Sequence, residues 1–535
     1  MAFLETFGQQ AAFCWDWVLE NVWYINLFFS IAIVFFQRRD PKSVWTWLFA
    51  LNFIPVFGVL FYLLFGQDFR KSRMFRVKEV EDRLRYPIRG QEQAIQEYRQ
   101  MKAQDSTLQD FSSLVLYNLE NSGAVLTMNN ELEIFTDGEK KFADLRRELR
   151  SARHHIHLQY YIIKNDQVFD SIIPILTEKV KEGVEVRVLA DGMGGRFMPE
   201  RRWRELKAAG VKVAVFFPPV LRRLQLRVNY RNHRKIGVID GRLGYVGGFN
   251  IGKEYISRDP RFGYWRDTHL KIRGDAALGL QIRFALDWNY AAHENLFLRS
   301  EFFGSREVNG LEEPLEMEGD DAGQTDGKGH TNSGAGQAGS GAEQEDGTGN
   351  AASKVGIQII SSGPDTRTRT IRDNYLELFH KAKDHIYIQT PYFVPDDAIL
   401  SALRIAASSG VDVRLMIPCK PDHPFVYWAT YSYAGDLIQA GGRCFVYENG
   451  FLHAKGITVD GLASCCGTAN IDIRSFELNF EVNAVIYDEA ATRQLEQAFL
   501  DDLPHCREIT PEDYRNRSLV IRGKEQFCRL LSPLL

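Results

Sequence analysis

Two long runs without a charged side chain open the chain, residues 21–37 and 43–67. A helix needs about 20 apolar residues to cross the hydrocarbon core of a bilayer; the second run is long enough, and the first is with its flanks. The stretch QRRDPK at 37–42 leaves room only for a tight turn. Four tryptophans lie near the predicted helix ends, where amphipathic rings favour the membrane interface: Trp15, Trp17, Trp23 and Trp45. The pattern therefore predicts a transmembrane helical hairpin.

Charges around these runs bear on two alternatives and on orientation. A cleaved signal peptide is disfavoured, because Glu5, Asp16 and Glu20 stand where such a peptide carries basic residues. A hairpin buried in a protein core is the other alternative. Basic residues lie in the turn, at Arg38, Arg39 and Lys42, and a larger group follows the second run, at Arg70, Lys71, Arg73, Arg76 and Lys78. The positive-inside rule places the larger group, and the chain beyond it, in the cytoplasm, where it would also attract anionic lipid headgroups.

Further along, one segment divides the chain. Residues 319–353 contain no aromatic residue and no Leu, Ile or Val, so they cannot bury enough apolar surface to offset the entropy of ordering. We expect a disordered acidic, glycine-rich linker. The predicted organisation is a hairpin with a basic juxtamembrane segment (1–80), a connecting helix (81–107), a first domain (108–305), the linker (306–354) and a second domain (355–535).

The two predicted domains repeat each other. HIHLQYYII at 155–163 resembles HIYIQTPYF at 385–393, and GVEVRVL at 183–189 resembles GVDVRLM at 410–416. In each domain, an alternating apolar strand is followed by a helical stretch and a second strand, which predicts an α/β layer fold. A third region aligns without a gap at an offset of 220 and holds these identical pairs: His233/His453, Lys235/Lys455, Asp240/Asp460, Gly247/Gly467 and Asn250/Asn470.

Four of the identical pairs, those of His, Lys, Asp and Asn, carry polar side chains, while core positions such as Ile236/Gly456 differ. Packing alone would predict the reverse, so the repeat indicates chemistry. If the motif forms a strand, each His shares a face with its Lys, and the Asn after the glycine-rich turn can reach back beside the His. Bringing the halves together collects many hydrogen-bond donors around one place, which suits a phosphate.

Two histidines can divide the work at such a phosphate. A neutral imidazole can attack phosphorus, and a protonated one can deliver a proton to the leaving alkoxide. The two Lys and two Asn would stabilise the non-bridging oxygens, so neither a metal nor another cofactor is required. Asp267 and Glu481 are the candidates for orienting the imidazoles. Asp240 and Asp460 end their predicted strands, and they either act with the motif or cap the turns at Gly241 and Gly461.

Composition adds two limits. The formal net charge is −4, but residues 316–346 hold eight acids and one lysine, so the remainder carries +3, which suits an anionic partner. The chain has seven cysteines, an odd number, and no C-x-x-C motif, which argues against a disulfide scaffold or a zinc site.

Paired H-x-K-x4-D motifs followed by G-x-x-N resemble the phospholipase D superfamily. The words RNHRKIGVIDGRLGYVGGFNIG, YWRDTHLKIRG, IQTPYFVPDD and GTANIDIRSFELNFE are most similar to the bacterial cardiolipin synthases. The resemblance implies two tandem α-β-α sandwich domains in a multi-pass protein of the bacterial cell membrane, and a phosphatidyltransferase. That enzyme would move a phosphatidyl group between two phosphatidylglycerol molecules through a phosphohistidine and release glycerol.

Residue by residue, the resemblance implies that His233 is the nucleophile and His453 the general acid and base, acting with Lys235, Lys455, Asp240 and Asp460. Asn250, Asn470 and Thr468 would contact the substrate; where the second half has Thr468, the first has Gly248. No cofactor and no nucleic-acid partner are expected.

Alternatives of other kinds stay open at this point. A phospholipase D that hydrolyses its lipid, or a transferase for another headgroup, would use the same residues. A non-catalytic lipid-binding scaffold would be expected to lack part of one motif, and a nuclease to carry a basic stripe. Three further features have weaker implications. The HHIH stretch is either a metal site or plain strand residues, and residues 220–231 are either a membrane-surface segment or a solvated basic face. Cys465 and Cys466 are predicted to pack in a core.

Overall fold

The computed structural model describes residues 2–36, 41–54, 56–59, 62, 96, 98, 100, 106–218, 230–303, 355–366 and 368–532. Several predicted features lie outside these residues: Arg38 and Arg39, the basic cluster at 70–78, nearly all of the connecting segment 81–107, the linker 306–354, and residues 220–229 of the basic segment.

The first half builds a seven-stranded sheet with the order β1-β9-β7-β6-β2-β3-β4. The neighbours β2, β3 and β4 are parallel, and every other neighbouring pair is antiparallel. The strands are β1 (Asn130–Phe135), β2 (His155–Tyr160), β3 (Glu185–Asp191), β4 (Lys212–Phe216), β6 (Ile236–Ile239), β7 (Leu243–Gly247) and β9 (His269–Gly274).

The second half repeats this order as β10-β19-β17-β16-β11-β13-β14 and adds β20 at the edge. The strands are β10 (Gly356–Ser362), β11 (His385–Gln389), β13 (Asp412–Pro418), β14 (Arg443–Tyr447), β16 (Gly456–Val459), β17 (Ala463–Gly467), β19 (Asn479–Tyr487) and β20 (Cys506–Ile509). The repeated strands predicted from the sequence correspond to β2 with β11 and β3 with β13, so the duplication is confirmed.

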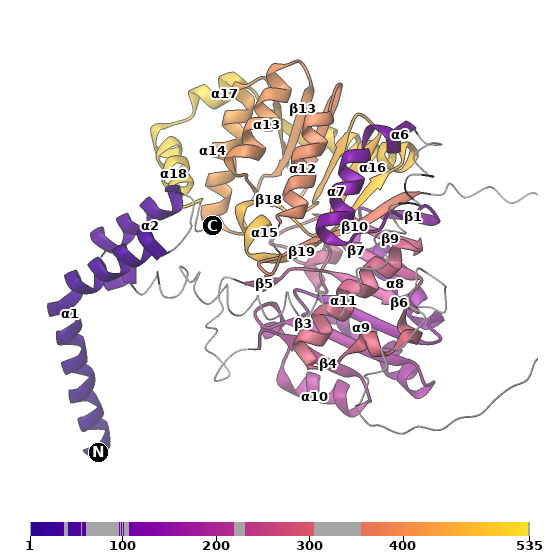
Figure 1. Ribbon diagram of the computed structural model, residues 1–535, viewed down its shortest axis with the longest axis horizontal. Coiled ribbons are helices and arrows are strands. Elements are labelled where there is room, and N and C mark those ends of the chain that lie inside the picture. The colour runs from indigo at the N-terminus through magenta and orange to yellow at the C-terminus, as the bar shows by residue number, and fades with distance from the viewer. Residues whose placement is uncertain are drawn as a thin grey trace, which may run out of the picture.

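Helices cover both faces of each sheet (Figure 1). On the first sheet, α8 (Gly138–Ser151) and α9 (Gln167–Lys181) pack on one face and α11 (Ala276–Ala292) on the other, with α10 (Glu200–Ala208) beside β4. On the second sheet, α12 (Thr370–Lys381), α13 (Asp397–Ser408) and α14 (Pro424–Gln439) pack on one face and α16 (Glu489–Asp502) on the other. The predicted pair of α-β-α sandwiches is confirmed.

The two halves also contain further helices and strands, most of them short. The helices are η1 (Gly194–Phe197), η2 (Lys253–Ile256), η3 (Leu296–Leu298), η4 (Ser300–Phe302), α15 (Ile473–Glu477), η5 (Leu503–His505), α17 (Pro511–Asn516) and α18 (Leu519–Leu530). The small strands are β5 (Arg231–Asn232), β8 (Trp265–Arg266), β12 (Phe393–Val394), β15 (Phe451–Leu452) and β18 (Ile471–Asp472).

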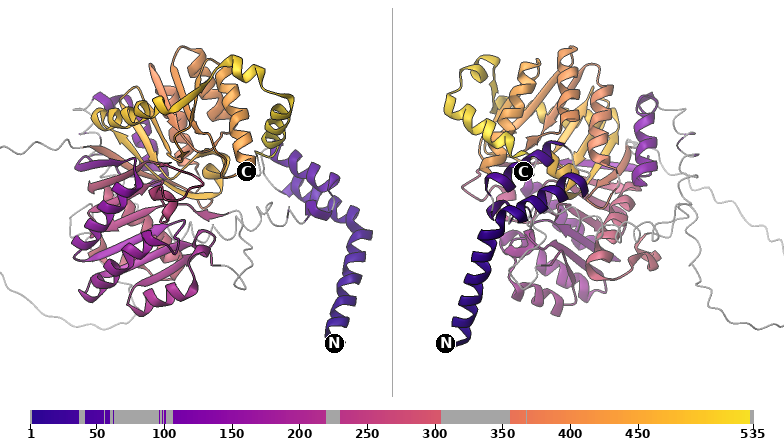
Figure 2. Two further views of the ribbon diagram at one scale, coloured as in Figure 1. Left: turned by 180° about the vertical axis from the view of Figure 1, so that it is seen from behind. Right: turned by 60° about the vertical axis from the view of Figure 1, so that its left-hand side comes forward.

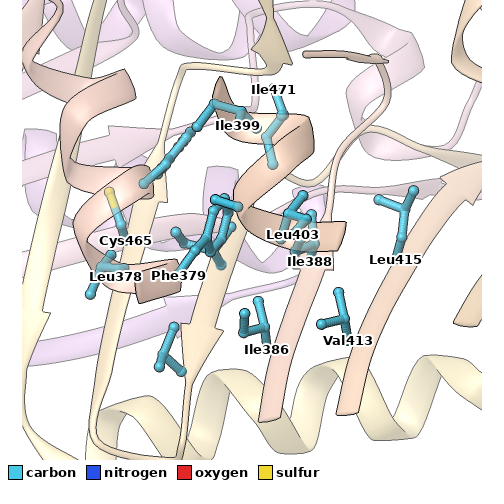
Figure 3. Close-up of a cluster of buried hydrophobic side chains, with 14 of the residues drawn as sticks. Leu378, Phe379, Ile386, Ile388, Ile399, Leu403, Val413, Leu415, Cys465 and Ile471 are labelled. Atoms are coloured by element: carbon cyan, nitrogen blue, oxygen red, sulfur yellow. The ribbon is translucent and has the colours of Figure 1, made fainter. Parts of the chain in front are cut away.

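The core beneath α13 shows how the sequence pattern becomes packing (Figure 3). Asp396 caps the helix by accepting from the Ile399 amide, and Ile399, Leu403 and Ala406 follow at helical spacing on the buried face. Ile386 and Ile388 alternate along β11 toward the same core, where Cys465 also lies. Cys465 and Cys466 are buried free thiols in β17, as expected for packing residues.

An apolar layer joins the halves. Ile236, Val246 and Leu280 of the first half pack in one cluster with Val482 and Leu495 of the second. Two short parallel strand pairs also cross between the halves: β5 pairs with β19, and β8 pairs with β15. The halves therefore form one body with a shared core and shared backbone hydrogen bonds.

Residues 106–122 pack on the second half, although the predicted first domain began at 108. Helices α6 (Ser106–Asp110) and α7 (Ser112–Ser122) bury Leu108, Phe111 and Leu114 in the second-half core. The Asn118 carboxamide donates to Gln358, at 3.0 Å, and to Asn374, at 2.9 Å. The apolar pattern of this segment fits either half, so only the three-dimensional contacts assign it.

At the N-terminus, α1 (Ala2–Phe36) projects from the body, and α2 (Pro41–Phe53) packs against α1, as both views of Figure 2 show. Ile33, Trp47, Leu51 and Tyr62 form their common cluster. Other large apolar side chains there face solvent; Tyr24, Phe35 and Trp45 are each more than 70% exposed.

The predicted membrane crossing can be compared with the length and apolar character of the helices. Within the described part of the chain, none of them combines the length and the apolar character that a membrane crossing requires.

A buried ion pair within the first half holds Arg234, whose guanidinium also contacts the second half. The Arg234 guanidinium lies 2.6 Å from each Asp287 carboxylate oxygen, and both side chains are fully buried. The Arg234 Nε also donates to the Glu481 carbonyl of β19, at 3.1 Å. Because a buried charge left without its partner is costly, this pair should fix the motif against the opposite half.

We expect Asp287→Asn to destabilise the protein by about 3–5 kcal/mol, since Arg234 would remain buried without its counter-charge. The double variant Asp287→Leu/Arg234→Met should recover much of the loss, because apolar groups of similar volume need no pairing. Thermal unfolding in detergent would measure both. The control is Glu489→Gln, which breaks the exposed Arg493–Glu489 pair and should shift the midpoint little. A midpoint for Asp287→Asn equal to that of this control would contradict the prediction.

Candidate active site

The crossing strand pairs bring the two motif histidines to the interface between the halves. In β5, Arg231 and Asn232 pair with Asn479 and Phe480, and the next amide, that of His233, donates to the Phe480 carbonyl at 3.0 Å. The other pair repeats this geometry, and the His453 amide donates to the Arg266 carbonyl at 2.7 Å. The expectation that each His and Lys lies within a regular strand is wrong: residues 233–235 and 453–455 are irregular links between two strands.

Each imidazole takes its carboxylate from the opposite half. His233 Nδ1 lies 2.9 Å from a Glu481 oxygen, and His453 Nδ1 lies 2.6 Å from an Asp267 oxygen. Both carboxylates are fully buried. A carboxylate facing Nδ1 holds the proton there and leaves the Nε2 lone pair available. Glu481 and Asp267, predicted to orient the imidazoles, thus contact them, and the partners are exchanged between the halves.

Different groups hold the two carboxylates. Glu481 accepts from the Thr468 hydroxyl, at 2.6 Å, and from Asn479 Nδ2, at 3.1 Å. Asp267 accepts from the Thr268 amide, at 2.8 Å. The resemblance implied that Thr468 touches the substrate; its hydroxyl instead donates to the carboxylate behind His233.

Gly248 occupies the position of Thr468 in the first half, and its lack of a side chain makes room for Asp267. A Cβ on Gly248 would lie 1.8 Å from an Asp267 carboxylate oxygen. The shorter acid therefore fills the space that a hydroxyl side chain fills in the second half.

Both lysines are buried beside their histidines. Lys235 Nζ donates to the His233 carbonyl, at 2.6 Å, and Lys455 Nζ to the His453 carbonyl, at 2.5 Å. Lys455 Nζ also lies 3.2 Å from His453 Nε2. Each ammonium is thus held next to an imidazole with further N–H groups to offer an anion.

Burial dominates the titration of the four basic groups. It lowers the pKa of His233 to about 4 and also lowers the pKa of His453. It lowers the pKa of Lys235 to about 7 and that of Lys455 to about 8.

The two carboxylates respond differently. Burial alone would raise their pKa, but the neighbouring histidines and lysines outweigh it and hold the pKa of Glu481 and Asp267 below the ordinary values. Neutral imidazoles between ionised carboxylates, with lysines that titrate near neutrality, suit a site that binds an anion.

The two asparagines differ in their contacts. Asn250 uses its whole carboxamide within the protein: Oδ1 accepts from the Ile162 amide and Nδ2 donates to the Tyr255 hydroxyl, both at 3.0 Å. Asn470 Nδ2 donates to Asp472, at 3.1 Å, while its buried Oδ1 has no hydrogen-bond partner among the described residues. Asn250 therefore positions the loop after β7 in this structure.

The motif aspartates make the contacts of caps. Asp240 accepts from the backbone amides of Arg153, His154 and His155, at 2.8–2.9 Å. Asp460 accepts from those of Lys383, Asp384 and His385 at the same distances. Each lies beyond the far end of the strand that follows its His, so these contacts favour the alternative in which the two aspartates are caps.

Two aromatic rings that the sequence analysis did not single out line the histidines. The Tyr161 ring centroid lies 5.1 Å from that of His233, and the Trp265 centroid lies 5.1 Å from that of His453. In the sequence, the only indication that these two residues line the site was their position in the stretches HLQYYII and YWRD. They give each imidazole an apolar wall.

The HHIH stretch follows the plain strand interpretation. His155 and His157 are buried in β2, where the His157 ring stacks on Phe284 and its Nδ1 lies 3.0 Å from Gln281. Across the described part of the chain, no group of three or more His, Cys, Asp or Glu could hold a metal ion.

Comparison with known proteins places these residues in a family. The family model described as "Cardiolipin synthase, PLD-like domain" matches residues 145–260 and 375–503, and one described as "Phospholipase_D-nuclease N-terminal" matches 25–67. The chain is 42% identical to the cardiolipin synthase of Oceanobacillus iheyensis over 97% of this chain and 99% of that protein. The identity to the major cardiolipin synthase of Bacillus subtilis is also 42%, over the same shares. The chain belongs to the cardiolipin synthase family of phospholipase-D-like enzymes.

The family resemblance predicted from the motif words is thereby confirmed. Among solved structures, the phosphatidylserine synthase of Haemophilus influenzae matches with a TM-score of 0.54 and 15% identity, over 80% of this chain and 98% of that one. At that identity, the match supports the fold of this cardiolipin synthase family member and nothing finer.

We expect Gly248→Thr to abolish most activity, because its side chain would displace the Asp267 carboxylate from His453. Loss of a partner that orients a histidine typically costs about 10–100-fold. Adding Asp267→Glu should restore part of the activity, because the pair would then copy Thr468 and Glu481. Activity would be measured as lipid product per enzyme.

Gly237→Ala is the matched control, since its Cβ would meet the Tyr245 side chain at an ordinary 3.5 Å. Full activity in Gly248→Thr would show that Asp267 does not serve His453.

Proposed function

We propose that the chain transfers a phosphatidyl group from one phosphatidylglycerol to another, forming cardiolipin and glycerol. The observation that carries this proposal is the exchanged pair of imidazole–carboxylate contacts beside two buried lysines, in a chain with near full-length similarity to proteins named cardiolipin synthases.

In the first step, the His233 Nε2 lone pair attacks phosphorus of the donor lipid. An N–P bond forms, the bond from phosphorus to the glycerol headgroup oxygen breaks, and His453 gives its Nε2 proton to that oxygen. Glu481 supports the positive charge that develops on His233. The bound phosphodiester adds a negative charge beside Lys235 and Lys455. That charge raises the lowered pKa of His453 and so favours the protonated imidazole, which must deliver the proton.

In the second step, His453 accepts the proton of a headgroup hydroxyl on the acceptor phosphatidylglycerol. That oxygen attacks phosphorus and the N–P bond breaks, so the histidines return to their starting states. The lysines stabilise the non-bridging oxygens in both steps. The unpartnered Asn470 Oδ1 would accept from a substrate hydroxyl.

The N-terminal helices are proposed to insert in the bacterial cell membrane with the two α/β domains on the cytoplasmic side. Trp23, Phe28, Phe35 and Trp45 are each more than 65% exposed, and such a surface is stable only against an apolar environment. Placing these helices in a bilayer would hold the site beside its lipid substrates.

We expect purified protein in phosphatidylglycerol vesicles to form cardiolipin and glycerol in equal amounts, as measured by mass spectrometry. His233→Ala should abolish both products. Phosphatidic acid without cardiolipin would instead assign a hydrolase, and turnover only with other headgroups would assign another transferase.

On a donor lipid whose headgroup is nitrophenol, which leaves without a proton, His453→Asn should trap the intermediate, because it removes the group that activates the acceptor. Peptide mass spectrometry after brief exposure to lipid is expected to locate the phosphatidyl group on His233. A label on any other residue would refute the assignment of the nucleophile.

The value of kcat/KM should rise as the pH rises through the pKa of His233, about 4, because the protonated imidazole cannot attack phosphorus. It should fall at higher pH in two stages. The free enzyme first loses the His453 proton that the leaving oxygen needs, because burial lowers the pKa of His453, and Lys235, with a pKa of about 7, then loses the charge that binds phosphate. Lys235→Arg should move the second stage up toward the pKa of Lys455, about 8, since arginine keeps its charge. Initial rates at low lipid concentration would measure this, and a second stage that does not move would exclude Lys235 as its source.

A further inference from the structure

The last helix of the chain has two apolar faces, of which the body covers one. Cys528 and Ser532 lie buried on the side that packs against α14, with Ile521 partly buried beside them. The opposite side carries Leu519, Val520, Phe527 and Leu530, which are exposed by 81%, 67%, 57% and 63%. At about 100° per residue these four share one stripe of roughly 100°.

Polar contacts fix α18 on the body and leave this stripe outward. Arg529 pairs with Asp436 of α14 at 2.6 Å, and Arg517, just before the helix, pairs with Glu525 at 2.7 Å. The Lys524 ammonium lies 5.2 Å from the Trp428 ring of α14. The exposed stripe is therefore a consequence of rigid docking.

The charges beside the stripe are basic. Arg522 and Lys524 are exposed and flank it, while Glu525, the one acid within α18, is buried against Arg517. An apolar stripe bordered by Lys and Arg is the composition of a helix that lies in the interface of an anionic membrane.

The position of α18 agrees with this partner. The views in Figures 1 and 2 place α18 on the side of the molecule from which α1 and α2 project. At the start of α14, beside it, Phe425 is also 52% exposed.

We infer that α18 docks on the surface of the anionic bilayer into which the N-terminal helices insert. This inference rests on the proposed function and membrane placement. Leu519, Val520, Phe527 and Leu530 would enter the acyl boundary, and Arg522 and Lys524 would contact lipid phosphates. The chain would then touch the bilayer at both ends of its sequence, which fixes the tilt of the site relative to the lipids.

The test compares the full chain with its Leu519→Glu/Phe527→Glu variant. Both are assayed on phosphatidylglycerol diluted in phosphatidylcholine nanodiscs and on monomeric short-chain phosphatidylglycerol. We expect the variant to lose about tenfold in turnover on nanodiscs and nothing on the monomeric lipid, because only the bilayer contact is removed. Leu298→Glu is the matched control, since Leu298 is 82% exposed and lies in the first half. Equal turnover of variant and wild type on nanodiscs, or equal losses on both substrates, would overturn the inference.

Hydrogen exchange supplies a readout that is independent of turnover. Amides of 519–530 in the full chain should be more protected in phosphatidylglycerol nanodiscs than in phosphatidylcholine nanodiscs or in detergent. Protection that is the same in all three and rises with protein concentration would assign the stripe to a second copy of the chain and reject the membrane. If the wild type turned over no phosphatidylglycerol but kept the lipid-dependent protection, the proposed reaction would fail while the docking surface stood.

Discussion

The exchange of carboxylates between the halves is the constraint on which the site depends. His233 faces Glu481 and His453 faces Asp267, so neither half holds a complete imidazole–carboxylate pair alone. The backbone makes the exchange possible, because β5 and β15 each leave their own sheet and pair with a strand of the opposite half. A chain that separated its halves would lose both pairs at once, which explains why two copies of the fold are joined through a continuous apolar layer.

Buried ion pairs beneath the site reinforce that junction, and they do so differently in the two halves. Asp287 on α11 and Asp502 on α16 hold corresponding places, each accepting from a β-strand glutamine, Gln159 or Gln389. Asp287 binds Arg234 of its own half, which reaches across to the Glu481 carbonyl. Asp502 binds Arg266 of the other half. In both cases a buried guanidinium beside a motif histidine connects the halves: Arg234 through the Glu481 carbonyl and Arg266 through the Asp502 carboxylate.

The sequence predicted much of this and missed what depends on contacts between distant segments. The offset of 220 between the motifs predicted the duplicated α/β domains, because identical polar residues in a drifting apolar background are visible in one dimension. The crossing of Glu481 to His233 was not predicted, because the acid of the same half is much nearer in sequence: Glu481 lies 248 residues from His233 in the pair that forms. The role of Asp240 was likewise left open, because an aspartate that caps a neighbouring loop cannot be told from a catalytic motif residue in the sequence alone. Residues 108–122 were assigned to the wrong half, because an amphipathic helix fits any apolar surface.

The division of labour that we propose for two nearly equivalent histidines would follow from the groups behind them. The motif residues themselves are the same in both halves, so they cannot distinguish a nucleophile from an acid. The surroundings can: a hydroxyl and a carboxamide hold the longer Glu481, whereas a backbone amide and, at 3.4 Å, the Trp265 indole N–H hold the shorter Asp267 in the space that Gly248 leaves open. After the duplication, specialisation therefore resides in the carboxylates and their supports, one layer behind the motif that both halves share.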